Sequence, residues 1–311
     1  MYFTAPQGPA ANTLRGGPDA ALAEAIDQAV LSVDMAAYSL DLWSIRDALL
    51  RAHRRGVSVR LVVESDNLDS DELIQITEAG VPLLGDRREG LMHNKFTVID
   101  RHEVWTGSMN YTVNGAYRNY NNLLRVRSSR LAENYLAEFE EMYVRDQFGP
   151  GSPADTPYPK QAIDSTQIET YFSPDDHVSN RIIDTLQGAE SSIQFLVFSF
   201  TSDEIARTLI EQVANGVIVQ GVLDSGQANS NIGGEFDNLQ QGGVAVRRDS
   251  LSGKTHHKVF ILDGRIVITG SYNMSGSAET RNDENILIIH NADIAGLYTD
   301  EFVKLYGSAV P

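Results

Sequence analysis

The sequence contains no cysteine, which excludes disulfide bonds, thiolate metal ligands and a cysteine nucleophile, although it does not identify a compartment. It has no run of about 18 uncharged apolar residues, the length that a membrane-spanning helix requires. Residues 1–17 lack a basic segment followed by an apolar run, so no secretory signal is visible. An exported chain whose leader has been removed and a cytoplasmic chain therefore both fit.

Positive charge is also scarce, since 25 Lys and Arg face 42 Asp and Glu and the net charge is −17. This balance argues against a protein that coats nucleic acid or anionic membrane with its whole surface. Only two tryptophans are present, and we find no amphipathic helix with a basic and an aromatic face that would bind a membrane surface. Hydrophobic residues make up 42%, which is ordinary for a globular protein with a core.

The organising feature of the chain is an internal repeat. The first matches have an offset of 160 residues and the later ones an offset of 163. Three pairs of segments carry the repeat, namely residues 32–39 and 192–199, residues 56–59 and 216–219, and residues 93–95 and 256–258. Tyr2-Phe3 and Tyr171-Phe172 mark where the two copies begin. We infer a tandem duplication.

The stretch between the copies, residues 148–159, is rich in Pro, Gly and Ser. Such a composition is typical of a connection without regular structure. The sequence therefore predicts a first half over residues 1–149, a linker over residues 150–166 and a homologous second half over residues 167–311.

Each copy alternates strand-like and helix-like patterns. The first copy predicts strands at residues 33–38 and 57–63 and helices at residues 20–30, 42–54 and 71–79. The second predicts strands at residues 193–198 and 217–223 and helices at residues 178–186 and 205–214. We expect an α/β fold whose two halves are related by a pseudo-two-fold axis. Each half should contain a mixed, mostly parallel sheet flanked by helices, to which late hairpins add antiparallel strands.

Strand geometry groups the polar side chains of each copy. If residues 91–99 form a strand, His93 and Lys95 point to one face, and His256 and Lys258 do so in the second copy. His257 points to the opposite face, and we do not expect it in the site. After a short turn the motif Gly-Ser-x-Asn follows in each copy, and it supplies Ser108, Asn110, Ser271 and Asn273.

These residue types suit an anionic substrate. Lys and Asn donate hydrogen bonds to anionic oxygens, and Ser adds a hydroxyl. A histidine acts as nucleophile or general acid near neutral pH. Two copies packed around a pseudo-two-fold axis would place one histidine on each side of a phosphorus, as a two-step displacement through a phosphohistidine needs. A zinc site is not expected, because a lysine accompanies each histidine and would repel a cation.

The two copies resemble the paired HKD motifs of the phospholipase D superfamily. The resemblance rests on His-x-Lys-x₄-Asp at residues 93–100 and 256–263, each followed by Gly-Ser-x-Asn. It implies a double α/β sandwich, a phosphohistidine intermediate, no metal or other cofactor, and a phosphodiester substrate. Asp100 and Asp263 would then support the motif from a turn and take no part in the chemistry.

The copies differ after the Gly-Ser-x-Asn motif, where the family usually carries an acidic residue. Glu284 occupies this position in the second copy and Asn121 in the first. A carboxylate favours the protonated form of a neighbouring imidazole. We expect Glu284 to pair with His256, which would then be the general acid. His93 would lack such a partner and act as the nucleophile.

The substrate class stays open between two alternatives and a third, minor one. Both motif regions are locally basic, with seven basic and three acidic residues over 87–127 and six and three over 247–281. The compact copies resemble small endonucleases of the superfamily, and four tyrosines near the motifs are candidates for stacking on bases: Tyr111, Tyr117, Tyr120 and Tyr272. The sequence favours nuclease-like cleavage of single-stranded nucleic acid. The alternatives are a phospholipase D or phosphatidyl transferase, and an inactive phosphate-binding module. We expect a monomer without an obligate protein partner.

Overall fold

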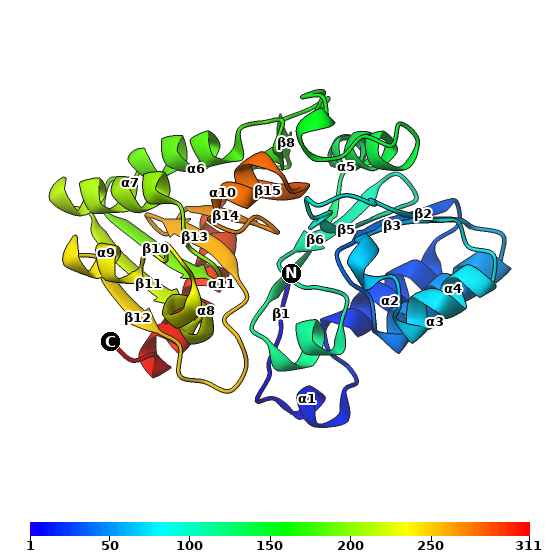
Figure 1. Cartoon of the computed structure of the whole chain (residues 1–311), viewed down its shortest axis with the longest axis horizontal. Coiled ribbons are helices and arrows are strands. Elements are labelled where there is room, and N and C mark those ends of the chain that lie inside the picture. The colour runs from blue at the N-terminus through cyan, green and yellow to red at the C-terminus, as the bar shows by residue number, and fades with distance from the viewer.

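The computed structural model describes residues 1–311, which form two halves that lie side by side (Figure 1). The first half contains β1 (Tyr2–Phe3), α1 (Pro9–Thr13), α2 (Pro18–Gln28), β2 (Ser32–Ala37), α3 (Trp43–Arg54), β3 (Ser58–Val63), α4 (Asp71–Glu78), β4 (Leu83–Gly85), β5 (Lys95–Ile99), β6 (Glu103–Gly107), a π-helical turn (Asn114–Arg118), β7 (Asn122–Arg127) and α5 (Ser129–Tyr143). Short 3₁₀ turns lie at Ser65–Asn67 and Gly149–Gly151.

The second half repeats this order with one additional strand at its start. It contains β8 (Lys160–Ile163), β9 (Thr166–Ser173), α6 (Val178–Gln187), β10 (Ser192–Val197), α7 (Asp203–Ala214), β11 (Ile218–Leu223), α8 (Ser225–Ser230), α9 (Phe236–Gln241), β12 (Ala245–Arg248), β13 (Lys258–Leu262), β14 (Ile266–Gly270), α10 (Gly276–Thr280), β15 (Glu284–His290) and α11 (Ala292–Ser308). None of the helices is both long and apolar enough to cross a bilayer.

The two sheets have equivalent strand orders. The seven-stranded sheet runs β1-β7-β6-β5-β2-β3-β4, and the eight-stranded sheet runs β8-β9-β15-β14-β13-β10-β11-β12. Apart from the extra edge strand β8, each strand of one sheet has a counterpart in the other. The α/β class and the two homologous halves are thus confirmed. Residues 160–163, which we expected in the linker, form β8 and pair with β9.

The expectation of mostly parallel sheets is wrong. In each sheet only two strand pairs are parallel, β2–β3 and β3–β4 in the first and β10–β11 and β11–β12 in the second. Parallel neighbours need a crossover, usually a helix. Helices α3 and α4 provide the crossovers in the first half, but no helix separates β4 from β5, and β5 enters antiparallel to β2. Hairpins then add β6 and β7.

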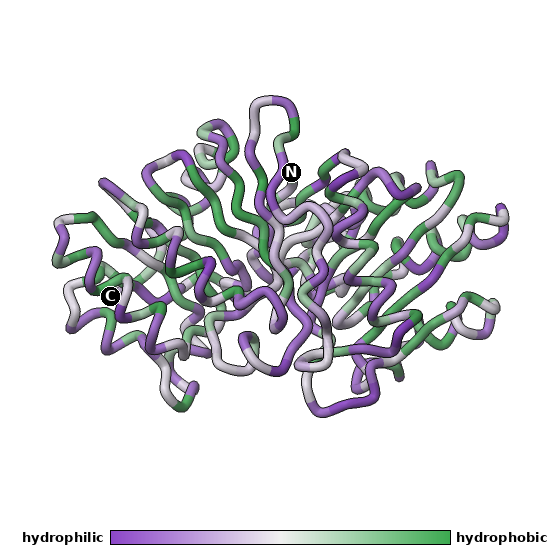
Figure 2. The backbone as a smooth tube through the Cα atoms, turned by 90° about the horizontal axis from the view of Figure 1, so that it is seen from above, coloured by the Kyte–Doolittle hydropathy of each residue, from purple (hydrophilic) through white to green (hydrophobic).

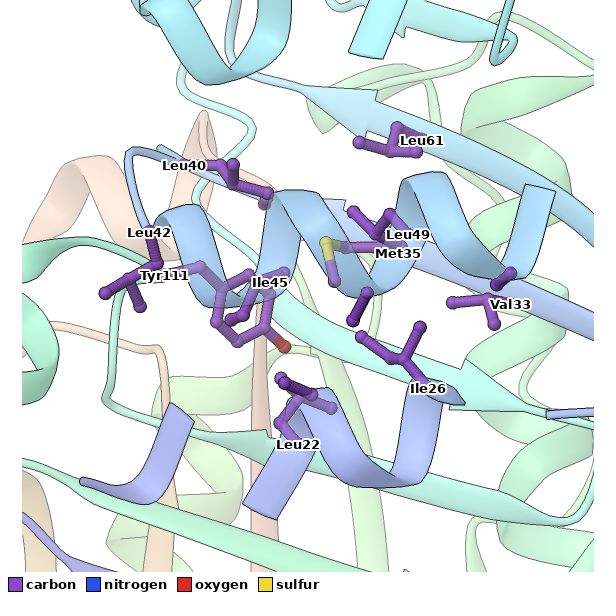
Figure 3. Packing of buried hydrophobic residues seen from close by; sticks show 14 of the residues in the cluster. Leu22, Ile26, Val33, Met35, Leu40, Leu42, Ile45, Leu49, Leu61 and Tyr111 are labelled. Atoms are coloured by element: carbon purple, nitrogen blue, oxygen red, sulfur yellow. The ribbon is translucent and has the colours of Figure 1, made fainter. Parts of the chain in front are cut away.

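Three hydrophobic clusters hold the layers together. One lies between the first sheet and α2 and α3, where Leu22, Ile26, Met35 and Leu49 pack against one another (Figure 3). Its counterpart in the second half lies under α6, α7 and α9. The third cluster, the central cluster, contains residues of both sheets together with residues of α5 and α11. Figure 2 shows hydrophobic stretches in the interior of both halves and hydrophilic stretches at many of the outer turns.

Reciprocal contacts join the halves. Met92 forms an isolated bridge with Asp283, and Tyr120 forms the equivalent bridge with Thr255. The Thr106 hydroxyl donates to Asn285 Oδ1 at 3.0 Å, while the Thr269 hydroxyl donates to Asn122 Oδ1 at 3.2 Å. Such exchange of equivalent partners is the signature of a two-fold interface, here formed within one chain.

The motif aspartates anchor each sheet at the end distant from these contacts. Asp100 accepts hydrogen bonds from the backbone N–H groups of Val30, Leu31 and Ser32 at 2.7–3.1 Å. Asp263 does the same for residues 190–192, and these bonds hold its pKa well below the ordinary value. Both carboxylates therefore fix the start of the strand next to the motif strand.

We predict that Asp100→Asn lowers the free energy of unfolding by about 1–2 kcal/mol, because an amide offers these N–H groups one acceptor oxygen in place of two. Asp164→Asn is the matched control, since Asp100 and Asp164 share a φ of 52° and the Asp164 side chain makes no hydrogen bond. Urea unfolding measures both changes. Equal stability of the two variants would contradict the anchoring role of Asp100.

Candidate active site

The two motifs enter the site from equivalent strand ends. Lys95 is the first residue of β5, and Lys258 is the first residue of β13. Phe96 and Val98 belong to the central cluster, and Lys95 therefore projects from the opposite face of β5. The four motif side chains are buried, since His93 and His256 are 6% and 7% exposed and Lys95 and Lys258 are 1% and 2% exposed.

The docking of the halves brings the motifs together. His93 N donates to the Asp283 carbonyl at 3.0 Å, and His256 N donates to the Tyr120 carbonyl at 3.0 Å. The backbone of each histidine is thus hydrogen-bonded to the backbone of the opposite half. Each lysine also acts electrostatically on the histidine of the other half. Lys258 contributes to lowering the pKa of His93, and Lys95 contributes to lowering the pKa of His256. The four groups form one electrostatic site.

The expected pairing of Glu284 with His256 is wrong. Glu284 Oε2 lies 2.7 Å from Nδ1 of His93, and Asn121 Oδ1 lies 2.9 Å from Nδ1 of His256. The error arises because the pairing is reciprocal between halves: the residue after each Gly-Ser-x-Asn motif reaches the histidine of the other copy. Sequence proximity indicates the partner within a copy and does not reveal this exchange.

Burial controls the protonation of the site. It is the main cause that raises the pKa of Glu284 to about 7 and lowers that of Lys95 to about 7. Desolvation, together with the two lysines, also holds the pKa values of both histidines well below their ordinary value. The site therefore holds two lysines, two histidines and one carboxyl group in a desolvated region that disfavours their charged forms. A bound anion would therefore restore charge to the lysines and histidines.

Two aromatic side chains that we did not predict flank the imidazoles. The Tyr38 ring lies 4.7 Å from the His93 ring, and the Phe198 ring lies 4.7 Å from the His256 ring. Nζ of Lys95 lies 4.9 Å from the Tyr38 centroid, and Nζ of Lys258 lies 5.0 Å from the Phe198 centroid. These aromatics directly follow β2 and β10 and match each other in the repeat, which is a signal that could have identified them.

The hydroxyl groups of the motif serines form hydrogen bonds within the protein. The Ser108 hydroxyl donates to Asn121 Oδ1 and accepts from Asn122 N, and the Ser271 hydroxyl accepts from Asn285 N. Both serines are fully buried. Their predicted contact with phosphate stays a prediction, and the structure shows both hydroxyls already bonded to protein groups. The preceding glycines are needed because a Cβ at Gly107 or Gly270 would lie 2.5 or 2.1 Å from the next strand's carbonyl oxygen.

The motif asparagines retain hydrogen-bonding capacity. Asn110 and Asn273 are partly exposed, and the Nδ2 group of each, which can donate to a phosphate oxygen, makes no hydrogen bond within the protein, as is also true of its buried Oδ1. They stay candidates for binding the substrate phosphate together with the lysines.

His257 lies on the other side of its strand, where Nδ1 is 3.2 Å from Asn122 Nδ2 and the ring packs against Phe3. No group of three or more His, Asp or Glu side chains is placed to hold a metal ion.

Comparison with known proteins identifies the family to which the chain belongs. The family described as "Cardiolipin synthase, PLD-like domain" matches residues 22–143 and again residues 182–306. The chain therefore belongs to the phospholipase D superfamily, with one copy of the domain in each half.

Relatives and solved structures agree with this assignment. The mitochondrial cardiolipin hydrolase of Chlamydomonas reinhardtii is 33% identical over 127 residues, which are 41% of this chain and 56% of that protein. The phospholipase D of Rickettsia bellii (strain RML369-C) is 31% identical over 158 residues, 48% of this chain and 77% of that protein. The phosphatidylserine synthase of Haemophilus influenzae Rd KW20 shares the fold, with a TM-score of 0.72 and 15% identity over 91% of this chain and 82% of that one. The chain thus spans little more than half the length of the first of these relatives.

The pKa values predict a narrow pH optimum near 7 for kcat/KM, measured with bis(p-nitrophenyl) phosphate. The Glu284 carboxylate is present above pH about 7 and is lost as the pH falls, whereas the Lys95 ammonium is present below pH about 7 and is lost as the pH rises. Glu284→Gln should remove the acid limb and move the alkaline limb to lower pH, because the Glu284 carboxylate raises the pKa of Lys95. An acid limb that persists in this variant would assign it to another group.

Proposed function

We propose that this chain is a phospholipid phosphodiesterase that works through a covalent phosphohistidine on His93. The observation that carries the proposal is the pair of imidazoles, each held at Nδ1 by the opposite half and each beside a buried lysine. Membership of the phospholipase D superfamily supports phosphodiester chemistry. The scheme uses only side chains of this site and needs no metal ion.

In the first step Nε2 of His93 attacks the phosphorus while Lys95, Lys258, Asn110 and Asn273 donate hydrogen bonds to its anionic oxygens. A P–N bond forms as the P–O bond to the leaving alcohol breaks. His256 gives its Nε2 proton to the departing oxygen. In the second step His256 takes a proton from water or from an acceptor alcohol, whose oxygen attacks the phosphorus and releases His93. Water gives hydrolysis, and an alcohol gives transfer.

The contacts of the two histidines support this division of roles. Glu284 accepts the Nδ1 proton of His93, which leaves an Nε2 lone pair for attack, and its carboxylate stabilises the positive charge of a phosphorylated imidazole. His256 contacts only the neutral amide of Asn121 at Nδ1, and an imidazolium without a carboxylate partner releases its proton more readily. His93 is thus the nucleophile, as the sequence led us to expect, but for the opposite physical reason.

Phospholipid is favoured over nucleic acid on three grounds. The named relatives include a cardiolipin hydrolase and a phospholipase D. All four tyrosines considered for base stacking are at most 2% exposed and pack in the interior. Most arginines of the two basic regions form ion pairs with carboxylates, as Arg125 and Arg127 do with Glu103, and these arginines therefore do not form an open basic groove. The preference for nucleic acid that the sequence indicated loses its main support.

The role assignment predicts a burst experiment. With bis(p-nitrophenyl) phosphate the leaving group needs little protonation, so His256→Ala should release about one equivalent of nitrophenol per enzyme and then stall, because no base activates water. His93→Ala should show no burst. A burst in His93→Ala and none in His256→Ala would reverse the roles.

The substrate assignment predicts cleavage of phosphatidylglycerol in neutral detergent micelles, in the presence of EDTA, at a rate well above that of single-stranded DNA. His93→Ala and His256→Ala should each lower kcat about 10²-fold or more, whereas His53→Ala, on α3 away from the site, should not. Preferential cleavage of DNA would make the chain a nuclease. Absence of cleavage of both would favour a binding module.

A further inference from the structure

A polar cavity lies where the two halves meet, and one of its lining residues, Lys254, comes two residues before His256 in the chain. Its volume is about 470 Å³. Ten residues line it, none of them acidic, and the polar ones include Asn12, Asn114, Arg118, Asn119, Ser252 and Lys254. The cavity therefore combines two cationic side chains with amide and hydroxyl groups, which is a set of donors suited to an anion.

Both cations in this cavity lack a carboxylate partner. Arg118 donates to Asn114 Oδ1 at 3.3 Å and forms no ion pair. Lys254 forms no ion pair either, and its Nζ lies 5.4 Å from the centroid of the Phe198 ring. Most arginines elsewhere in the motif regions are neutralised, for example Arg87 by Asp146 and Arg281 by Glu89. The cavity therefore holds two of the few arginine and lysine side chains of the motif regions that have no carboxylate partner, along with Arg101 and Arg247 elsewhere in these regions.

The duplication shows that this charge is specific to one side. Arg281 is the repeat counterpart of Arg118, and it pairs with Glu89 at 3.3 Å. The counterpart of Lys254 is Leu91. Around His93 the equivalent rim therefore carries an ion pair and an apolar side chain, whereas around His256 it carries two unpaired cations.

Cross-half contacts fix the backbone that carries the two cations relative to the motif histidine. Tyr120 N donates to the Lys254 carbonyl at 2.8 Å, and Lys254 N donates to Asn119 Oδ1 at 3.2 Å. Gly253 permits this approach, because its φ is 99° and a Cβ there would lie 2.0 Å from the Arg118 carbonyl oxygen. The Phe198 ring lies near both groups, with its centroid 5.4 Å from Lys254 Nζ and 4.7 Å from the His256 ring centroid.

We propose that Arg118 and Lys254 form a subsite for a second phosphate group, carried by the leaving alcohol of the substrate. This inference rests on the proposed function, in which His93 attacks and His256 protonates the leaving oxygen on the opposite side of phosphorus. An anion in the cavity then belongs to the leaving group. The fitting substrate class is a phospholipid whose two phosphates are joined through a short polyol, as in cardiolipin.

The proposal fixes the products. Attack by His93 on one phosphate of cardiolipin breaks the bond between that phosphorus and the central glycerol oxygen, which takes the proton of His256. Phosphatidylglycerol leaves with the second phosphate, and hydrolysis of the phosphohistidine releases phosphatidate.

The test compares kcat/KM for cardiolipin and for phosphatidylglycerol, each dilute in neutral detergent micelles. Lys254→Leu introduces the residue of the repeat counterpart, and Arg118→Gln removes the second cation. Each should lower kcat/KM for cardiolipin about 10-fold, the scale of one charge-assisted hydrogen bond, and leave phosphatidylglycerol within about two-fold. Arg281→Gln is the matched control and should leave both substrates within two-fold. All three side chains lie at the surface, and thermal unfolding verifies the fold of each variant.

Equal losses for both lipids, or no loss for either, would overturn the subsite while the proposed function stands. If the wild type cleaves neither lipid, the proposed function itself fails. If it cleaves single-stranded DNA alone, and both variants weaken that reaction, the cavity binds a neighbouring phosphate of a nucleic acid and the lipid assignment is overturned.

Discussion

The site depends on one constraint, which is that each histidine is oriented by a side chain from the opposite half. The Nδ1 atom of His93 is hydrogen-bonded to the Glu284 carboxylate, and Nδ1 of His256 is hydrogen-bonded to Asn121 Oδ1. Buried polar groups need partners, and neither half supplies one for its own histidine. A neutral amide in one pair and a carboxylate in the other also make two otherwise equivalent imidazoles chemically different. Docking of the halves therefore both builds the site and distinguishes its two histidines.

The interior around these pairs explains why the site suits an anion. Two lysines, two histidines and one carboxylate are desolvated together, and without an anion the cationic forms are disfavoured. A phosphodiester would restore their charge and gain several charge-assisted hydrogen bonds in a region of low dielectric. The central cluster, which α5 and α11 share with both sheets, keeps the halves in register and makes this desolvation possible.

Much of this could be predicted from the sequence because the repeat carries the information twice. The repeat offset of 160–163 residues identifies His93, Lys95 and their counterparts. The alternation of side chains along a strand correctly predicts that His257 points to the other face. The mostly parallel sheet was predicted wrongly because residues 86–94 form no helical crossover before β5. The partner of Glu284 was also wrong, since a periodic pattern describes one copy and not the way in which two copies dock. Tyr111 and Tyr272 were candidates for stacking from their position alone, and only packing reveals that they are buried.

The most direct test of the shared site is a ¹⁵N NMR titration of the histidine rings in the wild type, Glu284→Gln and Asn121→Asp. Assignments would come from His93→Ala and His256→Ala. We predict that Glu284→Gln changes the Nδ1 resonance and titration of His93 and leaves His256 nearly unaffected, whereas Asn121→Asp raises the pKa of His256 alone. The opposite pattern, in which Glu284→Gln acts on His256, would contradict the exchange of partners between the halves.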